Sequence, residues 1–353
     1  MTASTTDGNK TSASNPAQIV SVQDALRPNR RKLLALGATW VVLLAAGLGL
    51  PWVVGLYDLQ LAVQGATLAI LALSVGWLLR QTGQLSFGHA AFSGVSGYAA
   101  AILSTRTGLD TGITLLLGIV FATVFGFVVA CLIARLPGIT FAMLTLAVGM
   151  LVWVASTQLR FLTNGFDGLL VDFSDTLFGQ RAGAYTNPVV AWPLVWVLMM
   201  VTVAALWAVS RTVFGRRLTM VRENEERTRF AGHGTYWPRV LAFTISAGVA
   251  GVAGAFQVLN LGFISPEQLF FDKSGLPLIV AVIGGISSVA GPVAGAFVFT
   301  FVQSWLSGTA WYEIAIGAAL MLVVVIAPGG GADVVRRISG WIRRRVGRKK
   351  DHA

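Results

Sequence analysis

The chain has 353 residues, of which 55% are hydrophobic and 12% charged, and its mean hydropathy is +0.72. Soluble domains usually carry about 25% charged residues, so this composition excludes an ordinary globular protein and indicates a polytopic helical membrane protein. The net charge of +11 is strongly basic, and the single cysteine, Cys131, excludes an internal disulfide and a cysteine-rich metal site.

Ten apolar stretches follow a polar N-terminus. The first 32 residues are rich in Ser, Thr and Asn, which predicts a disordered cytosolic tail. The apolar runs behind them lie at 33–56, 59–79, 90–104, 112–133, 139–158, 189–209, 240–261, 275–288, 290–306 and 311–327. We therefore predict an all-α protein, a polytopic transmembrane helical bundle with about ten spans between residues 33 and 330.

Three of these stretches, 90–104, 275–288 and 290–306, are short or interrupted by glycine. Such segments can be tilted, broken or re-entrant where they are buried in protein or line a cavity, so whether they cross the whole membrane stays open at this point. Closely spaced glycines such as Gly251 and Gly254 predict close packing of neighbouring helices, with pore lining as the alternative.

The basic residues divide unevenly between the two sides of the membrane. With the N-terminus in the cytosol and alternating spans, 22 of the 26 Lys and Arg residues fall on cytosolic segments, which gives that side +15 and the outer side −4. This bias follows the positive-inside rule and predicts that both termini are cytosolic. It also accounts for the basic composition without a nucleic-acid partner.

Two connections and the C-terminus have a distinctive charge pattern. The outer connection, 159–188, is acidic and mixed, whereas the inner one, 210–239, is strongly basic. Within the inner one, residues 221–231 predict one short helix with acidic side chains early and arginines late, and Gly232 ends it. Residues 331–353 predict a basic amphipathic cytosolic tail that lies on anionic membrane lipid.

The predicted spans are nearly free of ionisable side chains. Glu313, near the outer start of the last one, is the single exception. Ion-coupled carriers usually keep charged side chains at mid-depth, although backbone carbonyls can bind Na⁺. The sequence also has no G-x-x-x-x-G-K-[ST] phosphate-binding loop. If the protein moves a solute uphill, we expect the energy to come from a nucleotide site on another polypeptide.

A polar, glycine-containing break at 83–92 separates the second predicted span from the third. Gly83 supplies a turn conformation, and Gln84 and Ser86 can satisfy backbone groups at the break. The simplest interpretation is a capped helix start. His89 has no second His or Cys at ligand spacing, which favours an uncharged polar contact over a metal site.

Several segments, in order along the chain, resemble one family of transport proteins. They are GQLSFGHAAFSGVSGYAAAIL at 83–103, ITFAMLTLA at 139–147, LTNGFDGL at 162–169, GRRL at 215–218, VRENE at 221–225, LAFTISAGVAGVAGAFQVLNLGFISP at 241–266 and GGISSVAGP at 284–292. Together they resemble the permease subunits of branched-chain amino acid ABC importers. The departures are small: Ser96 and Gly97 precede Tyr98 where Gly and Ala are usual, and Asn164 and Ser287 each replace a usual Gly.

The resemblance implies an importer assembled from several polypeptides in the bacterial plasma (inner) membrane. This multi-pass chain would pair with a second permease subunit, two cytosolic ATP-binding subunits would supply the energy, and an extracytoplasmic substrate-binding protein would deliver the amino acid. No cofactor, metal or catalytic residue is expected in this chain, because ATP and Mg²⁺ would bind the ATPase subunits.

The resemblance also suggests where the functional residues lie. The loop 210–239 would couple to the ATPase, and the residues assigned to that coupling are Arg222, Glu223, Asn224, Glu225 and Gly232. From charge alone, a solvated loop is an equally simple interpretation. For the solute path we select polar or aromatic groups beside helix breaks, namely Gln64, Ser86, Phe87, His89, Thr145 and Ser287.

Alternative functions remain at this stage. Urea permeases of the same kind share much of the signature, so another small polar solute is the nearest alternative. A stand-alone ion-coupled carrier or a passive channel belongs to a different class. An integral membrane enzyme is disfavoured, because the sequence has neither a His pair at metal spacing nor a G-x-S-x-G motif.

Overall fold

The computed structural model describes residues 30–307 apart from 172, 174 and 175, together with residues 314, 317, 318 and 321. Side chains are described from residue 38 onwards. The predicted N-terminal tail up to residue 29, nearly all of the tenth predicted span and the predicted amphipathic tail at 331–353 lie outside the described residues.

The described part of the chain is an all-α bundle, as predicted. Its helices are α2 (Arg30–Leu48), α3 (Leu56–Thr82), α4 (His89–Thr107), α5 (Thr111–Ile133), α6 (Gly138–Gln158), α7 (Arg160–Thr163), α8 (Pro188–Arg211), α9 (Val213–Glu223), α10 (Glu225–Phe230), α11 (Tyr236–Leu261), α12 (Phe271–Gly284) and α13 (Gly291–Leu306). Each of the first nine predicted spans overlaps one of these helices. Among the described residues, α3, α5, α6, α8 and α11 are long and apolar enough to cross a membrane.

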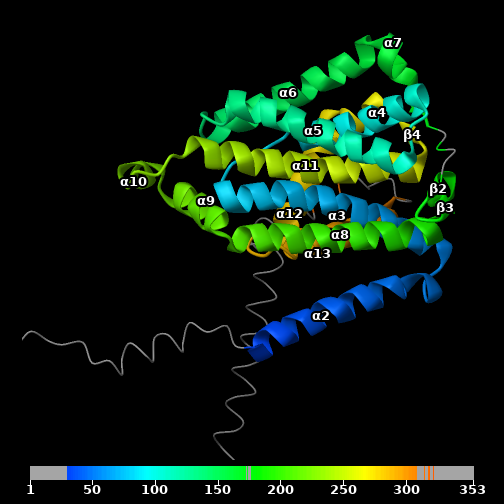
Figure 1. Cartoon of the computed structure of the whole chain (residues 1–353), viewed down its shortest axis with the longest axis horizontal. Coiled ribbons are helices and arrows are strands. Elements are labelled where there is room, and N and C mark those ends of the chain that lie inside the picture. The colour runs from blue at the N-terminus through cyan, green and yellow to red at the C-terminus, as the bar shows by residue number, and fades with distance from the viewer. Residues whose placement is uncertain are drawn as a thin grey trace, which may run out of the picture. The chain divides into compact units, whose positions relative to one another are not determined.

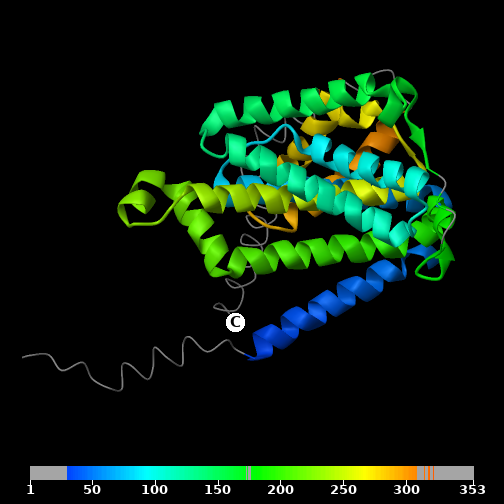
Figure 2. The same cartoon turned by 45° about the horizontal axis from the view of Figure 1, so that its top comes forward.

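By its internal contacts the chain divides into two units, residues 1–47 and residues 48–353. The first holds nearly all of α2. The second is built around α11, which packs against α5, α4 and α3, while α3 packs in turn against α8, α12 and α13. Figures 1 and 2 both show α10 at one end of this second unit and β2 and β3 at the opposite end. From the charge bias we expect the α10 end to face the cytosol.

The helix ends follow from local sequence. Asp110 caps α5 by accepting a hydrogen bond from the Gly112 amide, and Asn187 caps α8 in the same way through Val189. The C-terminal end of α3 lies at Gly83, whose φ of 73° is left-handed and favours glycine. Pro188 at the first position of α8 costs nothing, because its missing N–H would have no partner there.

Two short antiparallel strand pairs lie in the outer connections. β1 (Leu169–Leu170) pairs with β4 (Phe263–Ile264), and β2 (Thr176–Leu177) pairs with β3 (Gln180–Arg181). Short 3-10 helices accompany them at Leu50–Trp52, Gly165–Asp167, Ala182–Thr186 and Pro266–Leu269. Buried Phe173, Leu177 and Tyr185 from the connection 159–188 pack against Tyr98 of α4 and Leu259 of α11. The long outer connection is therefore a packed part of the fold.

The helix crossing of α4 and α11 depends on a missing side chain. A Cβ at Gly254 would lie 1.9 Å from the carbonyl oxygen of Ser93, so only glycine allows this approach. The turn between α12 and α13 is equally tight, since a Cβ at Gly284 would lie 2.0 Å from the Gly291 carbonyl oxygen. These contacts agree with the packing role that the glycine spacing predicts.

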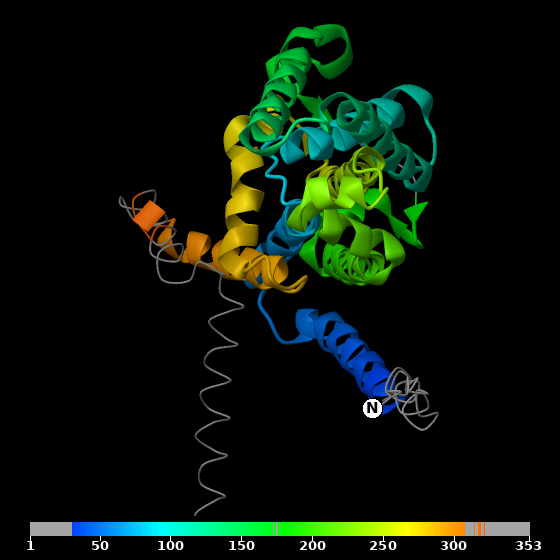
Figure 3. The same cartoon turned by 90° about the vertical axis from the view of Figure 1, so that its left-hand side faces the viewer.

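Two of the three short predicted spans, 90–104 and 275–288, are short for different reasons. The chain after α3 returns into the bundle as an irregular, non-helical segment, and α4 begins only at His89, whose ring contacts Ser246. Ser246 is ten residues from the start of α11, about 15 Å into the bundle by the helical rise, so α4 starts near mid-depth. In Figure 3, α12 lies across the bundle while α8 and α11 are seen nearly end-on.

One prediction for the inner loop is wrong. Residues 221–231 do not form one helix: α9 ends at Glu223, Asn224 is extended (φ −157°, ψ 104°), and α10 begins at Glu225. The Asn224 side chain accepts a hydrogen bond from the Arg227 amide and so acts as the N-cap of α10. Asparagine competes for backbone groups in this way, which a reading of charge order alone overlooks.

Candidate solute pocket and coupling loop

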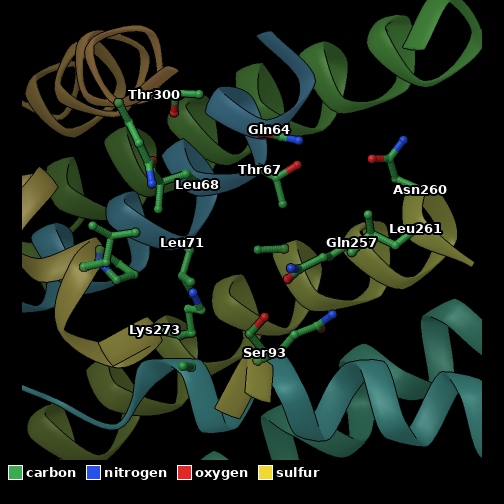
Figure 4. A pocket seen from close by; sticks show the side chains of 16 residues that line it. Gln64, Thr67, Leu68, Leu71, Ser93, Gln257, Asn260, Leu261, Lys273 and Thr300 are labelled. Carbon is green, nitrogen blue, oxygen red and sulfur yellow. The ribbon is translucent and has the colours of Figure 1, made fainter. Parts of the chain in front are cut away.

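A cavity of about 340 Å³ lies between helices of the second unit, toward the end opposite α10. It is lined by Gln64, Thr67, Leu68 and Leu71 of α3, Ala90 and Ser93 of α4, Ala253, Gln257, Asn260 and Leu261 of α11, Gln268, Lys273, Leu276 and Pro277 in or just before α12, and Thr300 and Gln303 of α13. Figure 4 shows side chains from these separate helices converging on one space. Its size is at the lower end of the ~300–1,000 Å³ of small-molecule sites.

The lining of this cavity, which we call the solute pocket, has two chemical characters. Leu68, Leu71 and Leu276 present aliphatic surface, whereas amide and hydroxyl groups such as those of Gln64 and Gln257 can donate and accept hydrogen bonds. Asn260 has a fixed orientation, because its Nδ2 donates to the Tyr185 carbonyl over 2.8 Å. Figure 4 shows its amide oxygen on the side that faces Thr67. The pocket therefore suits a small solute with both polar and aliphatic parts.

Of the six residues predicted for the solute path, Gln64 lines the solute pocket and the other five do not. Ser86, His89 and Thr145 are fully or almost fully buried, and Phe87 is half-buried. Ser287 lies in the turn between α12 and α13, where its Oγ is buried with no partner among the described residues. The role of these five in solute movement stays a prediction.

His89 is the centre of a buried hydrogen-bond network. Its Nε2 lies 2.7 Å from the Ser246 hydroxyl, which itself donates to the Ser74 carbonyl over 2.7 Å. Because Ser246 has a single O–H, the ring donates to it, and the neutral imidazole can accept at Nδ1 from Ser86, 2.9 Å away. The network ties α3, the segment 83–88, α4 and α11 together, which gives His89 the uncharged polar contact expected from the sequence.

Thr145 anchors the same segment from α6. Its hydroxyl accepts a hydrogen bond from the Phe87 amide at 3.1 Å and donates to the Ala142 carbonyl at 2.8 Å. Gly88 packs directly against the backbone of α6, since a Cβ there would lie 2.3 Å from the Thr145 carbonyl oxygen. The segment 83–88 is thus hydrogen-bonded to protein inside the bundle, as non-helical backbone at membrane depth must be.

Replacing Ser246 by alanine tests the buried network. We expect a loss of about 1–3 kcal/mol in stability, because the buried His89 Nε2–H loses its acceptor in a site without access to water. Thermal unfolding of the purified protein in detergent measures the effect. Thr244→Ala is the matched control on the same helix, because its hydroxyl bonds only to Val240 one turn away. Equal melting temperatures for the two variants would contradict this role.

Glu225 organises the inner loop. Its carboxylate accepts from Arg239 at 2.6 Å, from Arg229 at 2.6 Å and from Thr235 at 3.1 Å. Partial burial opposes ionisation, but the hydrogen bonds and charge of Arg239, with help from Thr235 and Arg229, outweigh it and hold the pKa of Glu225 below its usual value. Glu225 is therefore ionised at neutral pH and connects α10 to the start of α11.

The other residues predicted for coupling surround the same junction. Arg222 donates from Nη1 to the Arg80 carbonyl near the end of α3, at 2.5 Å, and its Cγ packs beside Gly83. Asn224 separates α9 from α10, Glu223 is exposed at the end of α9, and Gly232 has a left-handed φ of 80° just after α10. The inner loop is thus bonded to both α3 and α11, which is more order than a freely solvated loop would show.

The comparisons with known proteins agree with this geometry. Residues 57–327 match the family model described as the branched-chain amino acid transport system / permease component. The chain belongs to this permease family. The permease is 25% identical over 319 residues to the high-affinity branched-chain amino acid transport system permease protein LivM of Escherichia coli, covering 84% of this chain and 75% of that protein. LivM of Salmonella typhimurium matches to the same extent, over 318 residues.

A second group of relatives carries a different name. The permease is 30% identical over 156 residues to the autoinducer 2 import system permease protein LsrC of Photorhabdus luminescens, covering 42% of this chain and 47% of that protein. No solved structure matches the chain. Family membership and the apolar helices together make it a multi-pass protein of the bacterial inner membrane.

Sequence reasoning missed most of the residues that line the permease's solute pocket. Among them are Thr67, Gln257, Asn260, Gln268, Lys273, Thr300 and Gln303. A signal was present for three of them, since Gln257 and Asn260 are amides within the predicted span 240–261 and Gln303 is one within 290–306. Burying a polar group in such a span is costly unless it has a partner or a function. The selection favoured residues beside helix breaks, whereas the pocket is lined mainly from within the helices.

Proposed function

We propose that this permease is one of two membrane subunits of an ABC importer that moves branched-chain amino acids across the inner membrane. A substrate-binding protein delivers the amino acid at the outer face, and two ATPase subunits, which bind ATP and Mg²⁺, drive the change between outward- and inward-open states. The permease itself performs no covalent chemistry. The observation that carries the proposal is that the inner loop and the solute pocket share two helices.

The first shared helix is α3. Its pocket residue Gln64 and its end at Arg80, where Arg222 is bound, are 16 residues apart. The second is α11. It carries Asn260, which lines the pocket, and Arg239, which donates a hydrogen bond to Glu225 of the inner loop. At about 1.5 Å per residue, roughly 25–30 Å of continuous helix connects the two sites on each path. A displacement of the inner loop by an ATPase would thus reach the solute pocket through stiff elements.

The solvent-exposed surface of α10, in the inner loop, is suited to a protein partner. Phe230 at its end is 92% exposed, and the exposed arginines Arg227 and Arg229 lie beside it. Interfaces between proteins favour this combination of an aromatic side chain with arginine. The inner loop then acts as the coupling loop that the resemblance implies, with Glu225 holding its orientation.

The cargo is tested through the delivery protein and then in vesicles. The substrate-binding protein encoded beside this permease should gain thermal stability with L-leucine, L-isoleucine or L-valine, and vesicles with the complete complex should accumulate the same amino acids. Stabilisation and uptake with urea alone would replace branched-chain amino acids by urea as the cargo. Uptake of autoinducer 2 alone would place this permease functionally with LsrC.

A further inference from the structure

We propose that the solute pocket binds the carboxylate of its solute through the ammonium group of Lys273. Lys273 is the one residue with an ionisable side chain among the sixteen that line the pocket. The proposal rests on the proposed function, and it names the chemical group of the solute that this site recognises.

Lys273 is a basic residue on the outer side, whereas most basic residues of the chain lie on the cytosolic side. It is one of four basic residues on the outer side, where the acidic residues outnumber them. A cation on that side opposes the charge bias that orients the protein, so its position toward a pocket requires a reason. No acidic residue lines the pocket itself, so within the pocket an anionic group on the solute would be the counter-charge of Lys273.

The ion pair of Lys273 with Asp272 leaves the ammonium available. Its Nζ lies 3.4 Å from the Asp272 Oδ2, and the two side chains are 48% and 60% exposed. An exposed ion pair at that distance contributes little to stability. The other Asp272 oxygen accepts from the Lys273 amide at 2.7 Å, which holds the carboxylate close to the backbone. An ammonium has three N–H donors, so a solute carboxylate can be bound while Asp272 stays in place.

The remaining lining residues complement a zwitterion with an aliphatic side chain. Asn260 offers a carbonyl oxygen, because its NH₂ group already donates to Tyr185, and that oxygen can accept from a solute ammonium. Leu68, Leu71 and Leu276 can contact an aliphatic side chain. In Figure 4, Lys273 and Asn260 enter the space from different sides, with Thr67 and Gln257 between them. A neutral solute would offer the Lys273 ammonium no opposite charge, and the exposed pair with Asp272 would remain its ion pair.

The test uses the complete complex in proteoliposomes, with its second permease subunit, ATPases and binding protein, and radiolabelled L-leucine or urea as the solute. We expect Lys273→Gln to lower ATP-driven leucine uptake about tenfold or more, which corresponds to the loss of one charged contact. Lys273→Arg should retain at least about a third. Arg181→Gln removes an exposed outer charge on β3, away from the pocket, and should leave uptake unchanged.

A chemical rescue separates charge from folding. In a Cys131→Ser background, Lys273→Cys should regain leucine uptake after reaction with an aminoethyl methanethiosulfonate, which adds a positive charge, and not after reaction with the neutral methyl reagent. Uptake that survives Lys273→Gln, or equal rescue by both reagents, would overturn the carboxylate assignment and leave the importer proposal intact. A wild-type complex that moves urea and not leucine would overturn both.

Discussion

Replacing Glu225 by alanine is expected to reduce ATP-driven solute uptake by at least about tenfold, while the protein remains membrane-inserted. The change removes the acceptor of Arg239, Arg229 and Thr235, and it leaves the Arg239 side chain, only 10% exposed, without its carboxylate. Hydrogen bonds to charged groups contribute about 1.5–3 kcal/mol each, and every 1.4 kcal/mol corresponds to a factor of ten in an equilibrium. The loss should therefore favour orientations of α10 that no longer transmit motion.

Two variants calibrate this prediction. Glu226→Ala removes the neighbouring carboxylate, which is exposed and makes none of these contacts, so it should have little effect. Glu225→Gln keeps one oxygen acceptor and should fall between the two. The measurements are uptake into proteoliposomes and ATP hydrolysis by the same complex. We expect ATP hydrolysis to fall less than uptake. The lost contact is the one that joins α10 to α11, and it is not part of the ATP site. Equal uptake by the Glu225→Ala and Glu226→Ala variants would contradict the role of Glu225.

Replacing Gly254 by alanine is expected to disrupt the crossing of α4 and α11. The new Cβ would lie 1.9 Å from the Ser93 carbonyl oxygen and 2.9 Å from its Cα, so one helix must move because no flexible side chain can yield. Overpacking of a tight interior typically costs about 1–3 kcal/mol, and a clash with backbone belongs at the upper end of that range. Ser93 and Gln257 also line the solute pocket, so uptake should fall together with stability.

The matched control is Gly275→Ala on α12. A Cβ at Gly275 meets nothing within 4 Å, and alanine is the better helix former, so stability should be unchanged or slightly higher. Melting temperature and the yield of monodisperse protein in detergent distinguish the two variants. If Gly254→Ala is as stable as Gly275→Ala, the close approach of α4 and α11 does not exist in the membrane.

The sequence predicts the helices well because their signal is strong and local. Runs of apolar residues, including the three short ones, lead to nine helices in the right places, and the glycines of α11 and of the α12–α13 turn predict close packing. The same reasoning cannot locate the start of α4 at mid-depth, because that depends on Ser74 and Ser246, which lie far apart in sequence and meet only in the fold. Apolar content alone also does not reveal that α12 lies across the bundle.

The candidate site was only partly predictable for a similar reason. Gln64 lines the pocket, and its role in the solute path stays a prediction. The pocket is also lined by α4, α11, α12 and α13, whose proximity is a tertiary property. The position of Glu225 was predicted from its motif, whereas its bond to Arg239, 14 residues later, required the fold. Asn224 shows a local error: its capping side chain divides the helix that charge order predicted as continuous.

The central claim, that ATP hydrolysis on partner subunits drives solute movement through this permease, is tested most directly by uptake in proteoliposomes of defined composition. Vesicles with the permease pair, both ATPases and the loaded binding protein should accumulate L-leucine against its gradient only when ATP is present. Vesicles without the ATPases should show none, whatever Na⁺ or proton gradient is imposed. Accumulation driven by such a gradient without ATPases, or equilibration through this chain alone, would contradict the account and assign the protein to the carriers or channels.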